Sequence, residues 1–395
     1  SPTTSLLAGV AERFEAASDF TVGIEEEYQL LDPERLDLVN RYEELHAAAE
    51  PELAERLAGE LISSEIEYRT GAHATFGAAA RDLVEGRLAT IALADRLGIA
   101  TAVSGVHPWS PWTEQRIIDS PHYAKRDREL GYVAWTNNTW SIHLHAGVRG
   151  ADRAMAVCTA LRSVLPELLA LSANSALFMG RVTRLASTRT QIFTRSVPRC
   201  GIPEAYATWD EYRAFVDLLQ RTGSIVEARQ IWWSVRPAHD FGTIEIRICD
   251  GQTEMSEALS LAALMLASIA AFCHDHDEGR PIPAHPRALI EENLWRAERY
   301  GLEGELIDLD LGTTRPTRAA IERLLEWSAP VHEPLGLRRF LERVPVTLAE
   351  GNGAMRQVAR LDELGDVRAA HAETAERTRR SAEEALALVG AVAAT

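Results

Sequence analysis

Acidic, histidine and arginine side chains recur at alternate positions in four short segments of the chain. These positions are Glu25 and Glu27, then Glu65, Glu67 and Arg69, then His143 and His145, and finally Glu245 and Arg247. Carboxylate and imidazole groups bind divalent cations, and guanidinium groups bind phosphate oxygens. Carboxylates crowded on one face raise each other's pKa unless cations lie between them. The four segments therefore favour a site with two or more metal ions that handles phosphate groups.

The alternation itself predicts four β-strands, over residues 23–30, 62–69, 141–148 and 243–250. Side chains of a strand alternate between two faces, so each strand has a polar face and a largely apolar one. Glu26 lies on the opposite face from its neighbours, where we expect it to be solvated or in an ion pair. An antiparallel sheet whose polar face is merely solvated is the alternative interpretation.

The ligand types indicate which metal would bind. Carboxylates with an imidazole suit Mg²⁺ or Mn²⁺, and the four cysteines are too dispersed for a zinc cluster. Bound Mg²⁺ usually keeps coordination positions for substrate phosphates, which points to ATP. Zinc-dependent hydrolysis is the competing chemistry, since His-x-His also occurs in amidohydrolase barrels. That fold needs regularly alternating strands and helices, which this sequence lacks.

Charge and composition exclude several classes of partner. The 395 residues carry 41 basic and 58 acidic side chains, a net charge of −17, which disfavours nucleic acid and anionic membrane surfaces. Lys125 is the only lysine, and it follows no glycine-rich loop, so a P-loop is excluded. Arginines and metal ions must therefore hold any phosphate groups.

Helical periodicity surrounds the strands, and the fold class we expect is α+β. The expected helices span residues 42–61, 74–97, 149–173, 209–220, 256–273, 286–300, 318–327 and 366–388. We interpret residues 1–395 as one catalytic domain, with a sheet-bearing core over 15–275 and a mostly helical part over 276–395 packed on it. The longest apolar run, 259–273, is too short to cross a bilayer and indicates a buried helix. Residues 1–12 lack the pattern of a secretory leader, so we expect a cytoplasmic protein.

Several ordered blocks of sequence resemble the carboxylate–amine ligases of the glutamate–cysteine ligase type 2 group, from residue 21 to about residue 382. The blocks include TVGIEEEYQLLDP at 21–33, SGVHPW at 104–109, SIHLHAGV at 141–148, ASTRTQIF at 186–193, WWSVRP at 232–237 and FGTIEIRICD at 241–250. The resemblance implies a funnel-shaped antiparallel sheet like that of glutamine synthetase, with helices on its outer face. It also implies an amide-forming reaction in which ATP first converts a carboxylate into an acyl phosphate.

The resemblance assigns roles residue by residue. The metal-binding positions that it implies are Glu25, Glu27, Glu67, His143 and Glu245. Arg247 matches the arginine that stabilises the transferring phosphate, and Arg236 and His145 complete the catalytic set. The expected contacts to substrate or ATP are Arg189, Arg236, His145, Arg184 and Trp233.

One loop departs from the family pattern, because Val182 and Arg184 stand where Asp and Gly are expected. If this loop lines a substrate pocket, it favours an anionic substrate or one without a free amino group, and weak or absent activity on glutamate with cysteine. The substrates expected are a small carboxylate and a small amine, and a homo-oligomer is compatible with the sequence. A metal-dependent amidase and a nucleotide or amino-acid sensor built on the ligase fold are the alternatives.

Overall fold

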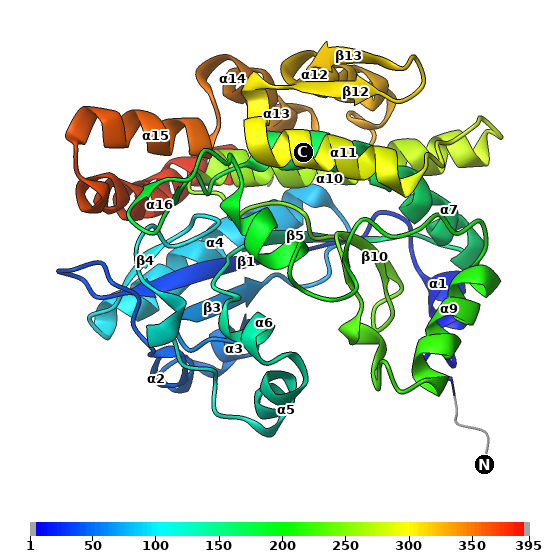
Figure 1. Cartoon of the computed structure of the whole chain (residues 1–395). Helices are drawn as coiled ribbons and strands as arrows, with labels where there is room; N and C mark the ends of the chain where they lie inside the picture. Colours follow the sequence, from blue (N-terminus) through cyan, green and yellow to red (C-terminus); the bar gives the residue numbers. More distant parts are fainter. Residues whose placement is uncertain (1–4, 391–395) are drawn as a thin grey trace.

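The structure is a computed structural model that describes residues 5–390, so the first four residues of the N-terminal stretch and the last five of the chain lie outside it. Its centre is a seven-stranded sheet in the order β10-β11-β5-β1-β3-β2, with β4 paired to the end of β1 (Figure 1). Every pair of neighbours in it is antiparallel. The strands are β1 (Val22–Leu31), β2 (Leu57–Ala58), β3 (Glu65–Arg69), β4 (Ala100–Ala102), β5 (Ile142–Gly147), β10 (Val235–Ala238) and β11 (Thr243–Ile246).

Three small two-stranded sheets lie outside the central one. They pair β6 (Leu177–Phe178) with β7 (Arg181–Val182), β8 (Cys200–Gly201) with β9 (Trp232–Trp233), and β12 (Glu305–Asp308) with β13 (Thr313–Pro316). The helical part over 276–395 therefore contains a hairpin, β12–β13, that the sequence pattern did not indicate.

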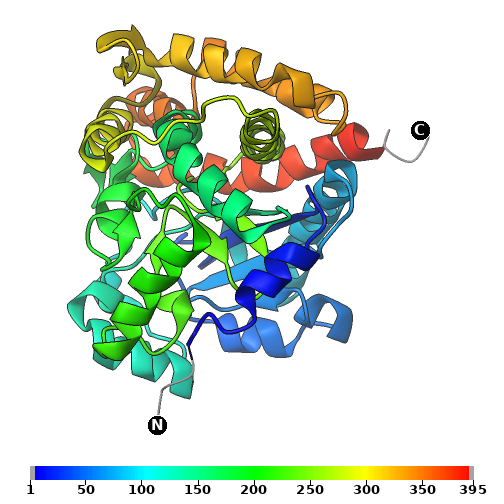
Figure 2. The ribbon, with the colours of Figure 1, turned by 90° about the vertical axis from the view of Figure 1, so that its right-hand side faces the viewer.

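The long helices pack on one side of the central sheet, and short helices lie on its other side (Figures 1 and 2). The α-helices are α1 (Val10–Ala16), α2 (Tyr42–Ala47), α3 (Pro51–Ala54), α4 (Phe76–Arg96), α5 (Pro121–Leu130), α6 (Tyr132–Trp135), α7 (Ala151–Leu161), α8 (Leu165–Ser172), α9 (Trp209–Arg221), α10 (Met255–Asp277), α11 (Arg287–Tyr300), α12 (Thr317–Trp327), α13 (Arg338–Leu341), α14 (Arg343–Glu350), α15 (Gly353–Leu364) and α16 (Val367–Gly390). Helices α4 and α10 contact the sheet directly, and α16 packs along α4 and α10. The predicted α+β class with an antiparallel sheet and outer helices is confirmed.

The expected helix over 42–61 is wrong. Proline cannot donate a backbone hydrogen bond and clashes with the preceding turn of a helix, so Pro51 interrupts the pattern. Helix α2 ends at Ala47, and Pro51 opens the separate short helix α3. The chain then enters β2, which pairs with β3 and extends the sheet.

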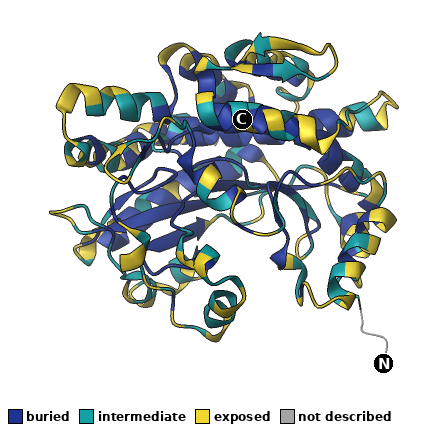
Figure 3. Cartoon of the chain, in the orientation of Figure 1, coloured by how far each residue is buried: buried dark blue, intermediate teal, exposed yellow. Residues whose placement is uncertain are grey.

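The apolar face of the central sheet forms part of the hydrophobic core. Ile24, Ile142, Leu144 and Ile244 are fully buried there, and Figure 3 shows the strands as part of the buried interior. Helix α10 extends beyond the apolar run 259–273 to 23 residues, which by length and composition alone would suffice to cross a membrane. However, 94% of the most apolar stretch of this helix is buried inside the protein. This agrees with the buried helix that the sequence predicted.

Glu26, the acidic residue on the apolar face, forms a fully buried ion pair with Arg87 of α4. Tyr28 also donates a hydrogen bond of 2.5 Å to Glu26, and Arg87 donates to the backbone carbonyls of Thr253 and Gln252. This network joins strand β1 to α4 and to the loop that follows β11. It confirms the ion-pair interpretation of Glu26.

We predict that Arg87→Met destabilises the protein, because it leaves the Glu26 carboxylate buried without a counter-charge. The free energy of unfolding should fall by about 3–5 kcal/mol, measured by urea denaturation. The double variant Glu26→Gln with Arg87→Met should recover much of this loss, since no charge then remains buried. Equal stabilities of the single and double variants would contradict the prediction.

Candidate active site

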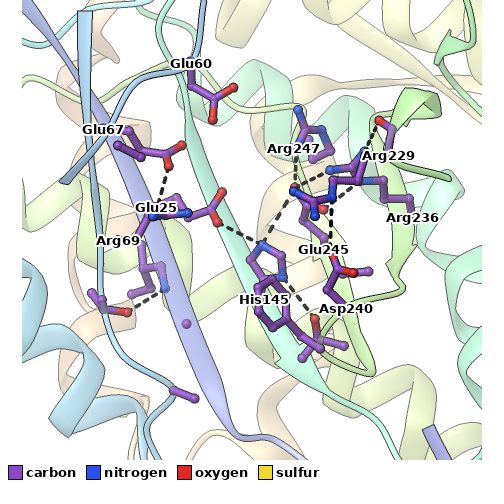
Figure 4. Close-up of a pocket in the computed structure, with 18 of the residues that line it drawn as sticks. Glu25, Glu60, Glu67, Arg69, His145, Arg229, Arg236, Asp240, Glu245 and Arg247 are labelled. Atoms are coloured by element: carbon purple, nitrogen blue, oxygen red, sulfur yellow. Dashed lines mark hydrogen bonds and ion pairs between the residues drawn. The ribbon is translucent and has the colours of Figure 1, made fainter. Parts of the chain in front are cut away.

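A cavity of about 660 Å³ opens on the polar face of the central sheet. Strands β1, β3, β5, β10 and β11 contribute its floor, and α5 and the β10–β11 turn contribute to its walls. Figure 4 shows Glu60 and Glu67 on one side, Arg229, Arg236 and Arg247 on the other, and His145 between them. Arg69 also lies on the first side and Glu245 and Asp240 on the second, so the cavity has a mainly acidic wall opposite a wall where arginines predominate.

Antiparallel register brings the chemically active side chains together from strands far apart in the sequence. Glu25 is paired across the sheet with His143, and Glu27 with Glu67. His145 is paired with Glu245, which in turn is paired with Arg236. Because paired residues of neighbouring strands project from the same face, the alternation in the sequence converts directly into one polar surface.

Two groups of side chains could each hold a metal ion. Glu25, Glu67 and His143 form the first group, and Glu25, His145 and Glu245 form the second, with the candidate ligand atoms of each group within 4.8 Å of one another. Four of the five predicted metal positions, namely Glu25, Glu67, His143 and Glu245, thus fall in these groups. Glu25 belongs to both groups, so it would help to hold an ion in either one.

Hydrogen bonds orient the two histidines. His143 Nδ1 lies 3.1 Å from a Glu25 oxygen, and its Nε2 lies 2.8 Å from the Ser141 hydroxyl. His145 Nδ1 lies 3.0 Å from the Thr243 hydroxyl, and its Nε2 lies 3.4 Å from Glu25 Oε1. The sequence assigned His145 to substrate, whereas the geometry also places it in the second candidate ligand group.

Glu245 is the centre of the basic side. Arg236 donates from Nε to Glu245 Oε2 at 2.7 Å, and Arg247 Nη1 donates to Glu245 Oε1. Burial alone would raise the pKa of Glu245, but Arg236, Arg247 and the two histidines together hold it well below its usual range. Burial lowers the pKa of His145, but Glu245 and Glu25 outweigh that effect and raise it.

Carboxylates on the acidic side shift in both directions. Burial would raise the pKa of Glu25, but His145 and His143 hold it below its usual range. Burial, together with neighbouring carboxylates, raises the pKa values of Glu65 and Glu67 well above their usual range. The same causes raise the pKa of Glu60, a residue that sequence reasoning missed. Glu60 lies in the connection between β2 and β3, where no alternation marks it, so only the fold brings it to the cavity.

The residues on the acidic side fit a divalent cation. Glu67 is almost fully buried, yet its Oε2 has no hydrogen-bond partner among residues 5–390. Buried polar atoms are almost always paired, so this oxygen is available to a ligand. Carboxylate oxygens with one imidazole are the donors that Mg²⁺ or Mn²⁺ accepts, and a cation would relieve the repulsion between Glu67, Glu25 and Glu60.

We predict that Mg²⁺ stabilises the protein more at high pH. A raised pKa means that the metal-free fold prefers the protonated carboxyl, so its stability falls as pH rises above the ordinary value of about 4.3. Mg²⁺ binds only the deprotonated form, and protons oppose it below the raised pKa. The gain in Tm at saturating Mg²⁺, measured by calorimetry, should be larger near pH 8 than near pH 5, by about 2 °C or more. Glu67→Gln should lose most of this pH dependence, and an equal gain at both pH values would contradict the prediction.

Two further predicted residues lie beneath the cavity surface. Glu27 accepts a hydrogen bond from the Ser141 backbone and belongs to neither candidate ligand group. Arg189 is 2% exposed, and its guanidinium donates to the carbonyls of Ile248 and Arg247 at 3.0 and 3.2 Å. Arg189 therefore fixes the end of the β11 segment and, in this conformation, does not reach the cavity.

Two of the expected substrate contacts, Trp233 and Arg184, lie outside the cavity lining. Trp233 packs among Tyr206 and Phe215 in the core, and Trp232 lines the cavity instead, because adjacent residues of β9 point to opposite faces. Arg184 is exposed, lies outside the cavity lining, and accepts a hydrogen bond from Arg299 at its carbonyl. The positive φ of 64° at Arg184 belongs to a turn on the surface.

Comparison with known proteins relates this site to a family. The model of glutamate–cysteine ligase family 2 matches residues 21–382. Two chains of Rubrobacter xylanophilus, provisionally named glutamate–cysteine ligases 2-2 and 2-3, are 38% and 40% identical. Each alignment covers 93% of this chain, with 94% and 99% of the respective relative.

Solved structures share the fold at low sequence identity. A glutamate–cysteine ligase of Francisella tularensis in complex with AMP has a TM-score of 0.63 at 12% identity, over 93% of this chain and 90% of that one. A bifunctional glutathione synthetase of Pasteurella multocida has a TM-score of 0.61 at 14% identity, over 96% of this chain and 55% of that one. The match of the family model, with relatives aligned over nearly their whole length, shows that this chain belongs to glutamate–cysteine ligase family 2.

Proposed function

We propose that this chain is an ATP- and Mg²⁺-dependent ligase that joins a small carboxylate to a small amine through an acyl phosphate. Membership of the ligase family supports ATP-dependent formation of a carbon–nitrogen bond. The observation that carries the proposal is the acidic wall of Glu25, Glu60 and Glu67 facing Arg236 and Arg247 across one cavity. Phosphoryl transfer between two anions needs such an arrangement, in which opposite charges hold both reactants in line.

The reaction balances in two steps. A substrate carboxylate oxygen attacks the γ-phosphorus of ATP, the bond to the bridging oxygen breaks, and ADP leaves. The amine nitrogen then attacks the acyl carbon, loses a proton, and expels phosphate that carries one of the original carboxylate oxygens. Bound Mg²⁺ would neutralise charge on the phosphates during this sequence.

The basic wall stabilises the transferring group in this proposal. Arg247 is held toward Glu245 through one nitrogen, and its buried Nε has no hydrogen-bond partner in the described part of the chain. That donor is available to a phosphate oxygen. Arg236 is positioned by Glu245 in the same way and would hold a carboxylate or phosphate. His145 lies between the two walls, where it can contact the phosphate or complete the second metal group.

The carboxylate ligands have a separate role. Glu25, Glu67, His143 and Glu245 would hold the ions, and Glu27, which hydrogen-bonds the backbone of Ser141, would support them from beneath. Arg184 is exposed and lies outside the cavity lining, which weakens the charge argument against the glutamate–cysteine pair. That pair therefore belongs in any substrate screen.

A screen for nucleotide release tests the proposal. We expect that Mg²⁺, ATP, one carboxylate and one amine together give ADP and an amide identified by mass, and that omission of either substrate suppresses ADP. Hydroxylamine in place of the amine should yield a hydroxamate, because acyl phosphates react readily with it. Amide hydrolysis without nucleotide consumption would instead identify an amidase and overturn the proposal.

A further inference from the structure

One arginine in the cavity wall differs from all the others. Six arginines line the cavity, and five of them have a carboxylate within ion-pair distance. The pairs are Arg56 with Asp82, Arg69 with Glu67, Arg229 with Asp240, and both Arg236 and Arg247 with Glu245. Arg126 has no ion pair and no hydrogen bond with any residue over 5–390, and its Nε is buried.

The surroundings of Arg126 hold it in place, and the acidic charge that acts on it, Glu60, does so from beyond ion-pair distance. Its guanidinium carbon lies 5.8 Å from the ring centroid of Trp232, which itself lines the cavity. Arg199 also stacks on that ring, at 5.6 Å, so a second cation is nearby. Such stacking orients a guanidinium fork but leaves its donors free.

Hydrogen bonds anchor helix α5, which carries Arg126, to two neighbouring segments. The Tyr123 hydroxyl donates to the carbonyl of Gly59, and Gln230 donates to Glu129 at 2.8 Å. Helix α5 is thereby anchored to the loop before β3 and to the loop before β9. The position of Arg126 over the cavity is thus set by the fold.

We infer that Arg126 is a substrate-binding residue that receives an anionic group, either a phosphate of the nucleotide or a carboxylate of the second substrate. A partly buried guanidinium without a hydrogen-bonded counter-charge is costly, and an oxyanion would satisfy its fork with two parallel hydrogen bonds. The other five cavity arginines each have a carboxylate of the chain within ion-pair distance. This inference rests on the proposed function, since it assigns one contact within the same site.

Binding measurements on matched variants of α5 test this role without requiring turnover. The variants are Arg126→Ala, Arg126→Lys and, as a control, Arg128→Ala, an exposed residue of the same helix outside the cavity lining. The probes for calorimetry are ADP with Mg²⁺, orthophosphate and L-glutamate. Thermal unfolding of each variant shows whether the fold is retained.

If the anion is a phosphate, Arg126→Ala should weaken binding of ADP or orthophosphate by about tenfold or more and leave L-glutamate unchanged. If it is a carboxylate, the reverse should hold. Arg126→Lys should recover part of the affinity, because lysine keeps the positive charge but lacks the paired donors of a guanidinium. The control Arg128→Ala should bind each probe as the unaltered protein does. Unchanged affinity of Arg126→Ala for all three probes would overturn the inference. Failure of the unaltered protein to bind ADP with Mg²⁺ would instead contradict the proposed function.

Discussion

Glu67→Gln is expected to lower kcat/KM for ADP release by at least about 100-fold at limiting Mg²⁺, because it removes one carboxylate of the first candidate metal group. The substitution preserves shape, and Glu67 Oε2 makes no hydrogen bond within the described residues that the change would break. The loss should shrink as Mg²⁺ is raised, since the variant binds the ion more weakly. Initial rates over a series of Mg²⁺ concentrations measure this effect.

Glu55→Gln is the matched control for this experiment. Glu55 lines the same cavity but is exposed and belongs to neither candidate metal group. Its substitution changes the net charge by the same amount, so it reports any effect of charge alone. Equal activity of the Glu67→Gln variant and the unaltered protein at low Mg²⁺ would remove Glu67 from the metal site.

Arg247→Ala is expected to reduce kcat by about 1000-fold with a much smaller change in the KM for ATP, because the guanidinium acts mainly on charge that develops during phosphoryl transfer. Arg247→Lys should recover little, since an ammonium cannot reproduce the fork between Glu245 and a phosphate. Steady-state rates of ADP formation measure both variants.

Arg229→Ala is the comparison for Arg247→Ala. Arg229 lies on the same basic wall, but its partner Asp240 is half exposed and solvent screens the pair. We expect its loss to change kcat by less than about tenfold. If both arginine variants lose kcat equally, the effect belongs to the general charge of the wall, and the specific role of Arg247 is contradicted.

The sequence predicted the polar face of the sheet because strand alternation is a local property. Glu25, Glu67, His145 and Glu245 could be assigned to one surface before their neighbours were known, and the antiparallel register then placed them in contact. The same rule also distinguishes Glu26 from the residues of the site, because it places Glu26 on the apolar face. There it forms an ion pair with Arg87.

Features that depend on distant parts of the chain could not be predicted in this way. Glu60 lies in a loop, and Arg126 lies on a helix that only the fold places above the sheet. The adjacent residues Trp232 and Trp233 carry the same side chain, so alternation says that they differ in environment but not which one is buried in the core. The chemistry of proline could have predicted that the helix is interrupted at Pro51. The spacing of apolar residues over 42–61 instead suggested one continuous helix.

Oxygen transfer from the carboxylate to phosphate is the most direct test of the central claim. With a carboxylate substrate labelled with ¹⁸O, ATP, Mg²⁺ and an amine, ³¹P NMR should show one labelled oxygen in the inorganic phosphate for each amide formed. This result follows because the phosphate that leaves the acyl intermediate keeps the oxygen that attacked ATP. Release of AMP and pyrophosphate, or unlabelled phosphate accompanying amide formation, would contradict activation through an acyl phosphate.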